Sequence, residues 1–197
     1  RIYKEFPPLP LDAIEENYSE KVVAQTREVL RRLKEHVNGL IILHGPVGTG
    51  KTFLLRAILT ELKKVREGLI CSPPLHFFQY AMDLAQAIAP HDKSLVIMED
   101  IGDVFTIEGK SRHVDASSNL FNLTDGLLSM LGSAVFLLSF NYDVGKIDPA
   151  LTRPGRCLAK IEIDLLPRAQ AQKLTGMALR HDEYSLAEVY QIKATHQ

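Results

Sequence analysis

Cysteine, net charge and long hydrophobic runs are all scarce in this sequence of 197 residues. The two cysteines, Cys71 and Cys157, are too few for a disulfide scaffold, and this favours a reducing compartment. Neither has a second cysteine or a histidine at metal-site spacing. The apolar runs at 39–43, 95–98 and 134–140 are far shorter than the ~20 residues that a membrane helix needs, so they indicate buried strands. We expect a soluble domain in the cytoplasm.

The charges nearly cancel, because 23 lysines and arginines stand against 24 aspartates and glutamates. This balance gives no sign of a nucleic-acid or membrane surface, although it is compatible with a local basic patch. Hydrophobic residues make up 46% of the chain, which is typical of a globular domain. The sequence begins at Arg1 rather than at methionine, which is compatible with a targeting sequence or membrane anchor upstream. We expect membrane contact only through such a segment.

Strands and helices alternate along the chain, which predicts an α/β fold with a parallel sheet between helices. Residues 1–18 contain a proline-rich stretch and are predicted as an extended N-terminal linker. Residues 19–165 are predicted as the α/β core, and residues 166–197 as a short helical lid without a strand. We expect five strands, at 40–43, 69–72, 95–98, 134–139 and 158–164. The expected helices are 20–37, 50–66, 76–89, 118–131, 168–180 and 185–193.

The most specific motif is a glycine-rich stretch that matches G-x-x-x-x-G-K-[ST], the P-loop or Walker A pattern. It consists of Gly45, Pro46, Val47, Gly48, Thr49, Gly50, Lys51 and Thr52. It follows an apolar strand and opens an amphipathic helix, where backbone N–H groups can hold phosphate oxygens. Lys51 would neutralise the β- and γ-phosphates, and the Thr52 hydroxyl would ligate Mg²⁺. The alternative is a glycine-rich turn with a surface lysine. His44, directly before the motif, is interpreted as a packed strand-end residue.

A pair of carboxylates, Glu99 and Asp100, follows the buried strand at 95–98. Ligands of open α/β sheets bind at this edge. One carboxylate can hold Mg²⁺ while the other polarises an attacking water. A solvated acidic loop is the alternative interpretation, and the phosphate-binding motif favours the catalytic one.

Four motifs in a fixed order resemble those of the AAA ATPases: the loop at 45–52, the acidic strand end at 95–100, Asn141 after its strand, and Ile-Asp-Pro-Ala-Leu-Thr-Arg-Pro-Gly-Arg at 147–156. The resemblance covers roughly residues 11–195. It implies a P-loop NTPase core that binds ATP or ADP with Mg²⁺ and hydrolyses ATP. It also implies a homo-oligomeric ring, usually a hexamer, that remodels or translocates a protein partner.

The same resemblance implies roles for single residues. Asn141 is similar to the sensor-1 residue that orients the lytic water. Arg153 and Arg156 are similar to the arginines that one subunit presents to its neighbour's nucleotide, where a guanidinium stabilises the transferring phosphoryl group. A salt bridge or a solvated turn is their alternative role. The family usually has Asp then Glu in its acidic (Walker B) pair, so the order here is reversed. We favour Asp100 as the base and Glu99 as the metal ligand, and the opposite assignment stays open.

Within that family, the Glu-Asp order and the Gly-Leu-Leu stretch at 126–128 resemble the mitochondrial subgroup of chaperones that translocate the Rieske iron–sulfur protein. The aromatic residues of 76–89 share a helix face, which favours core packing over a substrate-gripping pore loop. Two alternatives stay open. A DNA-handling ATPase of the helicase-loader type fits poorly with the near-zero net charge. A nucleotide-sensing module with weak hydrolysis would fit the reversed acidic order and the short lid.

Overall fold

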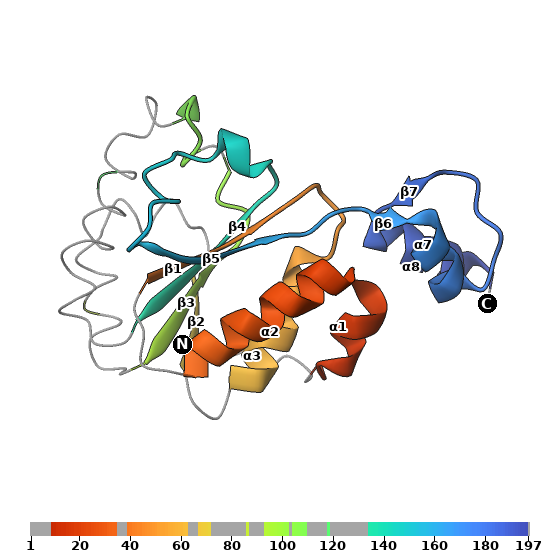
Figure 1. Ribbon diagram of the computed structural model, residues 1–197, viewed down its shortest axis with the longest axis horizontal. Helices are drawn as coiled ribbons and strands as arrows, with labels where there is room; N and C mark the ends of the chain where they lie inside the picture. Colours follow the sequence, from red (N-terminus) through yellow and green to blue (C-terminus); the bar gives the residue numbers. More distant parts are fainter. Residues whose placement is uncertain are drawn as a thin grey trace.

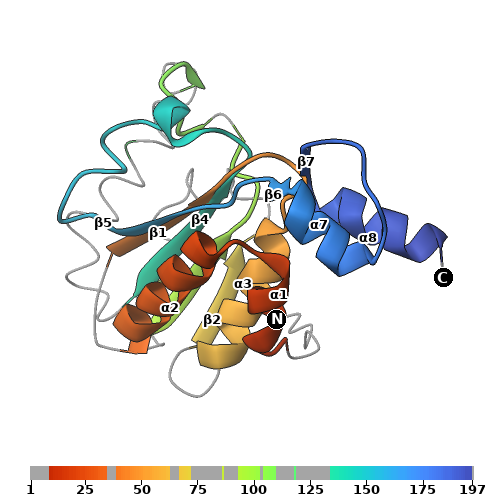
Figure 2. The same ribbon diagram turned by 45° about the vertical axis from the view of Figure 1, so that its right-hand side comes forward.

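A computed structural model describes residues 9–34, 39–62, 67–71, 86, 93–102, 104–109, 118 and 134–196. It shows an α/β fold in which a parallel sheet carries helices and a small C-terminal unit stands beside it (Figures 1 and 2). Apart from residues 86 and 118, the helices predicted at 76–89 and 118–131 lie outside the described residues, as does the Gly-Leu-Leu stretch at 126–128. No helix in the described part of the chain is long and apolar enough to cross a lipid bilayer.

The main sheet has the strand order β2–β3–β4–β1–β5, and every neighbouring pair is parallel. Its strands are β1 (Gly39–His44), β2 (Glu67–Cys71), β3 (Ser94–Met98), β4 (Val135–Phe140) and β5 (Cys157–Glu162). Every residue of β1, β3 and β4 is buried. Their sequences are apolar at nearly every position because both faces of the sheet are covered. The prediction of an α/β fold with a parallel sheet is confirmed.

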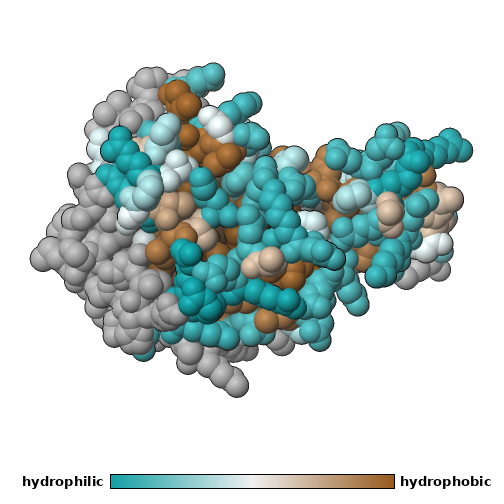
Figure 3. Space-filling model, in the orientation of Figure 1, coloured by the Kyte–Doolittle hydropathy of each residue, from teal (hydrophilic) through white to brown (hydrophobic). Residues whose placement is uncertain are grey.

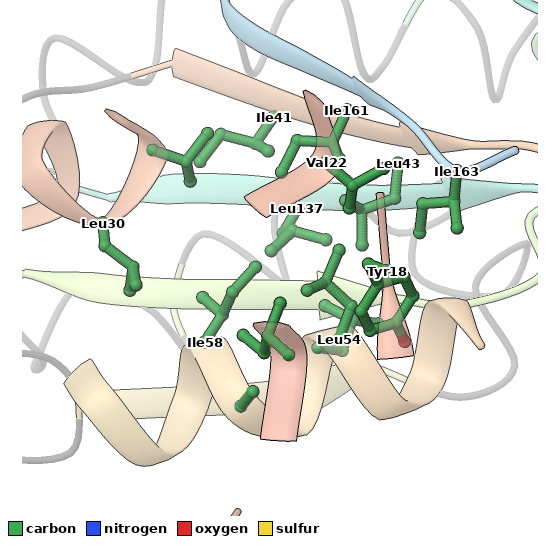
Figure 4. Close-up of a cluster of buried hydrophobic side chains, with 14 of the residues drawn as sticks. Tyr18, Val22, Leu30, Ile41, Leu43, Leu54, Ile58, Leu137, Ile161 and Ile163 are labelled. Carbon is green, nitrogen blue, oxygen red and sulfur yellow. The ribbon is translucent and has the colours of Figure 1, made fainter. Parts of the chain in front are cut away.

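Two hydrophobic clusters fill the two faces of the sheet, because alternate residues of each strand point to opposite sides. On one face, α2 (Glu20–Lys34) and α3 (Lys51–Leu62) pack against Ile41 and Leu43 of β1 (Figure 4). The outer side of α2 carries hydrophilic side chains (Figure 3). The opposite face is filled by residues that include Leu40, Ile42, Val96, Phe105, Phe136, Leu138 and Leu151.

Short elements follow β3 and β4 on the second face. The 3₁₀ helix η3 (Val144–Lys146) begins where the Asp143 carboxylate accepts the Gly145 N–H over 2.7 Å. An isolated antiparallel bridge joins Thr106 to Ile147. These contacts fix the chain that follows Asn141.

Residues 1–8 of the predicted extended linker lie outside the described residues, and the described part differs from the prediction, because Asp12–Asn17 form the helix α1. The Pro10 carbonyl accepts the Ala13 N–H over 3.2 Å, so proline precedes the helix without interrupting it. Ile14 is 1% and Tyr18 3% exposed, which shows that tertiary burial holds this segment. A six-residue helix has too little local stability to be evident from sequence pattern alone.

The C-terminal unit, residues 166–196, contains α7 (Arg168–Thr175) and α8 (Leu186–Thr195). These helices confirm the helical prediction for this part of the chain. The prediction that it lacks a strand is wrong, since β6 (Leu166–Pro167) pairs with β7 (Glu183–Tyr184) in an antiparallel ladder. Two-residue strands are too short to leave a recognisable alternation in the sequence.

Candidate active site

Three neighbouring strand ends bring the predicted site residues together. The phosphate loop, residues 45–52, follows β1, the acidic pair Glu99 and Asp100 follows β3, and Asn141 follows β4. Because β3, β4 and β1 are adjacent and parallel, their carboxyl ends meet at one edge of the sheet. Ligands bind at such an edge in open α/β folds.

Two glycines of the phosphate loop are required by close contacts. Gly45 has φ +148°, and a Cβ there would lie 2.2 Å from the Ile163 carbonyl oxygen. Gly50 has φ +93°, and a Cβ there would lie 2.6 Å from Tyr18 Oη and 2.7 Å from Leu186 Cδ2. A side chain at position 45 would displace the chain that follows β5. A side chain at position 50 would displace Tyr18, after α1, or Leu186 of α8. Glycine avoids these contacts.

The Lys51 ammonium lies inside the loop. Its Nζ donates hydrogen bonds to the Gly45 carbonyl over 2.9 Å and to the Pro46 carbonyl over 2.7 Å. The residue is 7% exposed, and this burial lowers its pKa, while the charge of Asp100 opposes the shift. Thr49 Oγ1 also donates to the Pro46 carbonyl, over 2.9 Å, which closes the turn. The loop thus holds a positive charge beside the N-terminus of α3, where anions are favoured.

Thr52 and Glu99 form a short hydrogen bond across the site. The Thr52 hydroxyl donates to Glu99 Oε2 over 2.5 Å. Hydroxyl and carboxylate oxygens are ligands that Mg²⁺ uses together with substrate phosphates and water. Within the described residues no cluster of three or more His, Cys, Asp or Glu could hold a metal. The Thr52–Glu99 pair therefore fits an ion that also needs nucleotide phosphates, and does not fit an all-protein cage.

Asp100 is held from two sides. Asn141 Nδ2 donates to Asp100 Oδ1 over 2.9 Å, and the Asp100 N–H donates to Ser139 Oγ over 3.0 Å. Asp100 has φ +50°, a conformation that non-glycine residues rarely adopt and that such tertiary bonds can maintain. Ser139 was not predicted as a site residue, because its signal in the sequence is only a hydroxyl near the end of an otherwise apolar strand.

A cavity of about 470 Å³ lies over these residues, within the range of small-ligand sites. Lys51, Thr52, Asp100 and Asn141 supply its polar side. The remaining lining includes Val47, Gly48, Gly50, Phe53, Leu186, Ala187 and Tyr190. The last three belong to α8, and the Ala187 N–H donates to the Gly48 carbonyl over 3.0 Å. These wall residues were not predicted, because no local sequence pattern relates α8 to the phosphate loop.

Arg153 and Arg156 lie away from this cavity, at the end of the sheet where its strands begin. The Arg156 carbonyl accepts the Leu40 N–H over 2.8 Å at the start of β1, whereas the phosphate loop follows the end of β1. At ~3.3 Å per residue, the start and the end of β1 are about 16 Å apart. Arg156 Nη1 donates to the Ala150 carbonyl over 3.1 Å, and Arg153 is exposed. Neither arginine is brought to the phosphate loop of its own chain.

His44 is a packed residue at the end of β1. It is 3% exposed, and burial lowers its pKa, which favours the neutral imidazole. Its side chain is not part of the cavity lining. This placement agrees with the interpretation made from the sequence.

A protein-family model described as "ATPase family associated with various cellular activities (AAA)" matches residues 41–165. The chain is 29% identical to the AAA-ATPase At3g50940 of Arabidopsis thaliana over 169 residues, which cover 75% of this chain and 34% of that protein. It is 33% identical over 144 residues to the 26S proteasome regulatory subunit S10B homolog B of the same plant, covering 67% and 35%. It is 30% identical over 135 residues to the plant's mitochondrial AAA-ATPase At3g28570, covering 62% and 29%. The chain thus spans about a third of the length of these relatives.

Proposed function

The chain belongs to the AAA family of ATPases, and from this premise we propose that it binds ATP with Mg²⁺ over the phosphate loop and hydrolyses it to ADP and phosphate. One observation carries the proposal. Lys51, the Thr52–Glu99 pair and the Asp100–Asn141 pair meet at one edge of the sheet, beside a single cavity.

Binding uses the loop and the start of α3. The first N–H groups of a helix have no intrahelical partner and can donate to phosphate oxygens. The Lys51 ammonium would exchange its two carbonyl partners for phosphate oxygens, which are stronger acceptors for a charged donor. The apolar side chains of Phe53 and Leu186 line another part of the cavity, where the less polar part of a nucleotide would lie.

For hydrolysis, we assign Asp100 as the group that accepts a proton from the attacking water, with Asn141 orienting both. Glu99 and Thr52 would hold Mg²⁺, which neutralises charge on the β- and γ-phosphates when bound. The pairing of Glu99 with Thr52, and of Asp100 with Asn141, supports this division over the reverse one.

The position of the two arginines supports an assembly. The Arg156 carbonyl bonds to Leu40 at the start of β1, whereas the phosphate loop follows the end of that strand, and this placement supports contact with a phosphate of another subunit. We assign Arg153 and Arg156 to the nucleotide of a neighbouring copy in a homo-oligomeric ring, usually a hexamer in this family. A guanidinium there would stabilise charge on the transferring phosphoryl group.

We further propose that turnover in this ring drives remodelling or translocation of a protein partner. Relatives named as regulatory subunits of the 26S proteasome support a protein partner. A role like that of the mitochondrial Rieske-protein translocases is the narrower form of this proposal. In it, residues 19–165 are the ATPase core and residues 166–197 act as a lid, whose contact with Gly48 supports that role.

The test measures binding and turnover on the same protein. We expect the chain to bind ATP with Mg²⁺ and to release phosphate at a rate that Lys51→Ala reduces strongly. Lys173→Ala, a matched change at an exposed position of α7, should leave both unchanged. Binding without phosphate release, even at high protein concentration, would favour a nucleotide-sensing module. Equal activity in the Lys51 and Lys173 variants would overturn the proposed site.

A further inference from the structure

Tyr18, between α1 and α2, has a buried hydroxyl that the proposed reaction does not use. The residue is 3% exposed, and its Oη donates to the Gly50 carbonyl over 2.6 Å. Its ring lies beside Phe53, with centroids 6.3 Å apart (Figure 4 shows Tyr18 above α3). Burial raises the pKa of this phenol, so the hydroxyl stays protonated and donates its hydrogen bond at neutral pH.

The bond to Gly50 acts on a peptide group of the phosphate loop. The Gly50 carbonyl also accepts the Leu54 N–H over 3.0 Å, the bond that closes the first turn of α3. The same planar, trans peptide contains the Lys51 N–H, which points opposite to the carbonyl. Lys51 is the first residue of α3, so its N–H has no intrahelical partner. By holding the carbonyl, Tyr18 fixes the direction of a donor that faces the phosphate site.

The same segment is also bonded to the C-terminal unit. The Tyr18 carbonyl accepts from Gln170 Nε2 of α7 over 2.9 Å. The neighbouring Asn17 Oδ1 accepts from Tyr190 Oη of α8 over 2.8 Å, and Tyr190 lines the cavity. Figures 1 and 2 both show α1 between the core helices and the C-terminal unit. Residues 17 and 18 therefore connect the phosphate loop to both C-terminal helices.

We propose that Tyr18 is a positioning residue for the nucleotide, whose hydroxyl aligns the Gly50–Lys51 peptide with the phosphates and whose main chain links that peptide to the C-terminal unit through Gln170. The inference rests on the proposed nucleotide site and extends it. A ring alone could fill this space, so the hydroxyl carries the specific claim.

The test compares Tyr18→Phe with Tyr184→Phe. Tyr184 is 5% exposed, and its Oη accepts the Arg180 and His181 N–H groups over 2.9 and 2.7 Å, so it is a matched buried phenol whose hydroxyl bonds to the C-terminal unit. We expect Tyr18→Phe to raise the Kd of a non-hydrolysable ATP analogue with Mg²⁺ by about 3- to 10-fold, because the freed Gly50–Lys51 peptide must then be ordered on binding, and one neutral hydrogen bond sets the upper limit of this effect. KM for ATP should rise similarly, with kcat changed less. Tyr184→Phe should change neither.

A second pair of variants keeps the test decisive should Tyr18→Phe fold poorly. Gln170→Ala removes the bond to the Tyr18 carbonyl and leaves the phenol in place, and Gln172→Ala is the matched change on the same helix. We expect Gln170→Ala alone to raise the Kd of the analogue, by about 2- to 3-fold. In the nucleotide-free protein, Tyr18→Phe should also speed hydrogen exchange of the Leu54 amide.

The outcomes separate the inference from the proposed function. If the wild-type chain binds the analogue and Tyr18→Phe binds it equally well, the positioning role is overturned while the site stands. Equal Kd values for the Gln170 and Gln172 variants would overturn the link to the C-terminal unit. A wild-type chain that does not bind the analogue would overturn the proposed function itself.

Discussion

Asn141 Nδ2 donates a 2.9 Å hydrogen bond to Oδ1 of Asp100, although the two residues are 41 positions apart in the sequence. The bond joins the end of β4 to the end of β3, and Ser139 holds the Asp100 N–H from the same strand. The protein's own groups therefore orient this carboxylate. Such preorganisation is what a group acting on a reacting water requires.

Substitution of the acidic pair should separate its two roles. We expect Asp100→Asn to lower kcat by about 10²- to 10⁴-fold, because the amide cannot accept the proton of the attacking water. Glu99→Gln should instead raise the Mg²⁺ concentration needed for half-maximal rate, because a neutral amide beside the Thr52 hydroxyl attracts the cation less than a carboxylate does. Steady-state ATPase assays across Mg²⁺ concentrations measure both effects.

Asp164→Asn is the matched control for the acidic pair, since Asp164 is exposed and pairs with Lys21 away from the cavity. It should retain full turnover. Loss of turnover in Glu99→Gln at every Mg²⁺ concentration, with Asp100→Asn active, would reverse the assignment. Full activity in both would remove the acidic pair from the mechanism.

The arginine assignment predicts a dependence on assembly. Because Arg156 bonds to the start of β1 and the phosphate loop follows the end of β1, we expect both arginines to act on a neighbouring subunit, so turnover per chain should rise with protein concentration as subunits meet. Arg153→Ala should lower kcat by about 10³-fold or more without weakening ATP binding, as expected for a guanidinium supplied in trans. ATPase rates and sedimentation over the same concentration range test this.

Arg27→Ala, which removes an exposed ion pair with Glu15, is a suitable control for the arginine variants. It should leave turnover unchanged. Turnover per chain that is constant with concentration, and unaffected by Arg153→Ala or Arg156→Ala, would contradict the proposed ring.

Glycine substitutions should distinguish close contact from backbone strain. Gly45→Ala combines φ +148° with a Cβ 2.2 Å from the Ile163 carbonyl. Gly176 has φ +72° with nothing within 4 Å of a Cβ, so Gly176→Ala meets strain alone. We expect Gly176→Ala to lower the free energy of unfolding by about 1 kcal/mol. Gly45→Ala should lower it by about 1 to 3 kcal/mol more, because overpacking adds to strain. Equal losses in chemical denaturation would show that the close approach is not required.

Glu28 should contribute to acid sensitivity. The Arg31 and Arg32 guanidinium groups lower the pKa of its carboxyl from 4.5 to about 2. Since the folded-state pKa is the lower one, the stabilisation is present above pH 4.5 and is lost as the pH falls towards 2. Glu28→Gln should therefore flatten the acid limb of a pH–Tm curve in that window. Exposed Glu16 provides the control, and an acid limb that Glu28→Gln and Glu16→Gln leave equally steep would contradict the assignment.

Local patterns in the sequence were sufficient for the phosphate loop and the parallel sheet. The loop residues act through their own backbone, and a strand such as β1 is apolar at successive positions because it is covered on both faces. The acidic pair could be placed at the ligand-binding edge because it follows a buried strand of a parallel sheet, whereas Asn141 was predicted only from the resemblance to the AAA ATPases. Each of these features depends on residues that are neighbours in the sequence.

The remaining parts depend on contacts between distant segments. Ser139, Tyr18 and Tyr190 carry no motif, and their importance comes from the partners Asp100, Gly50 and Asn17. Helix α1 was assigned to an extended linker because its stability comes from burial, which six residues of sequence do not reveal. The β6–β7 ladder was missed for the same reason of length.

The proposed function depends on a phosphate loop that holds a nucleotide through Lys51. The decisive experiment is a structure of the chain with a non-hydrolysable ATP analogue and Mg²⁺. We expect the phosphates at the N-terminus of α3, with Lys51 Nζ moved from the Gly45 and Pro46 carbonyls to a phosphate oxygen. An analogue bound elsewhere, with Lys51 still bonded to both carbonyls, would contradict the proposed function.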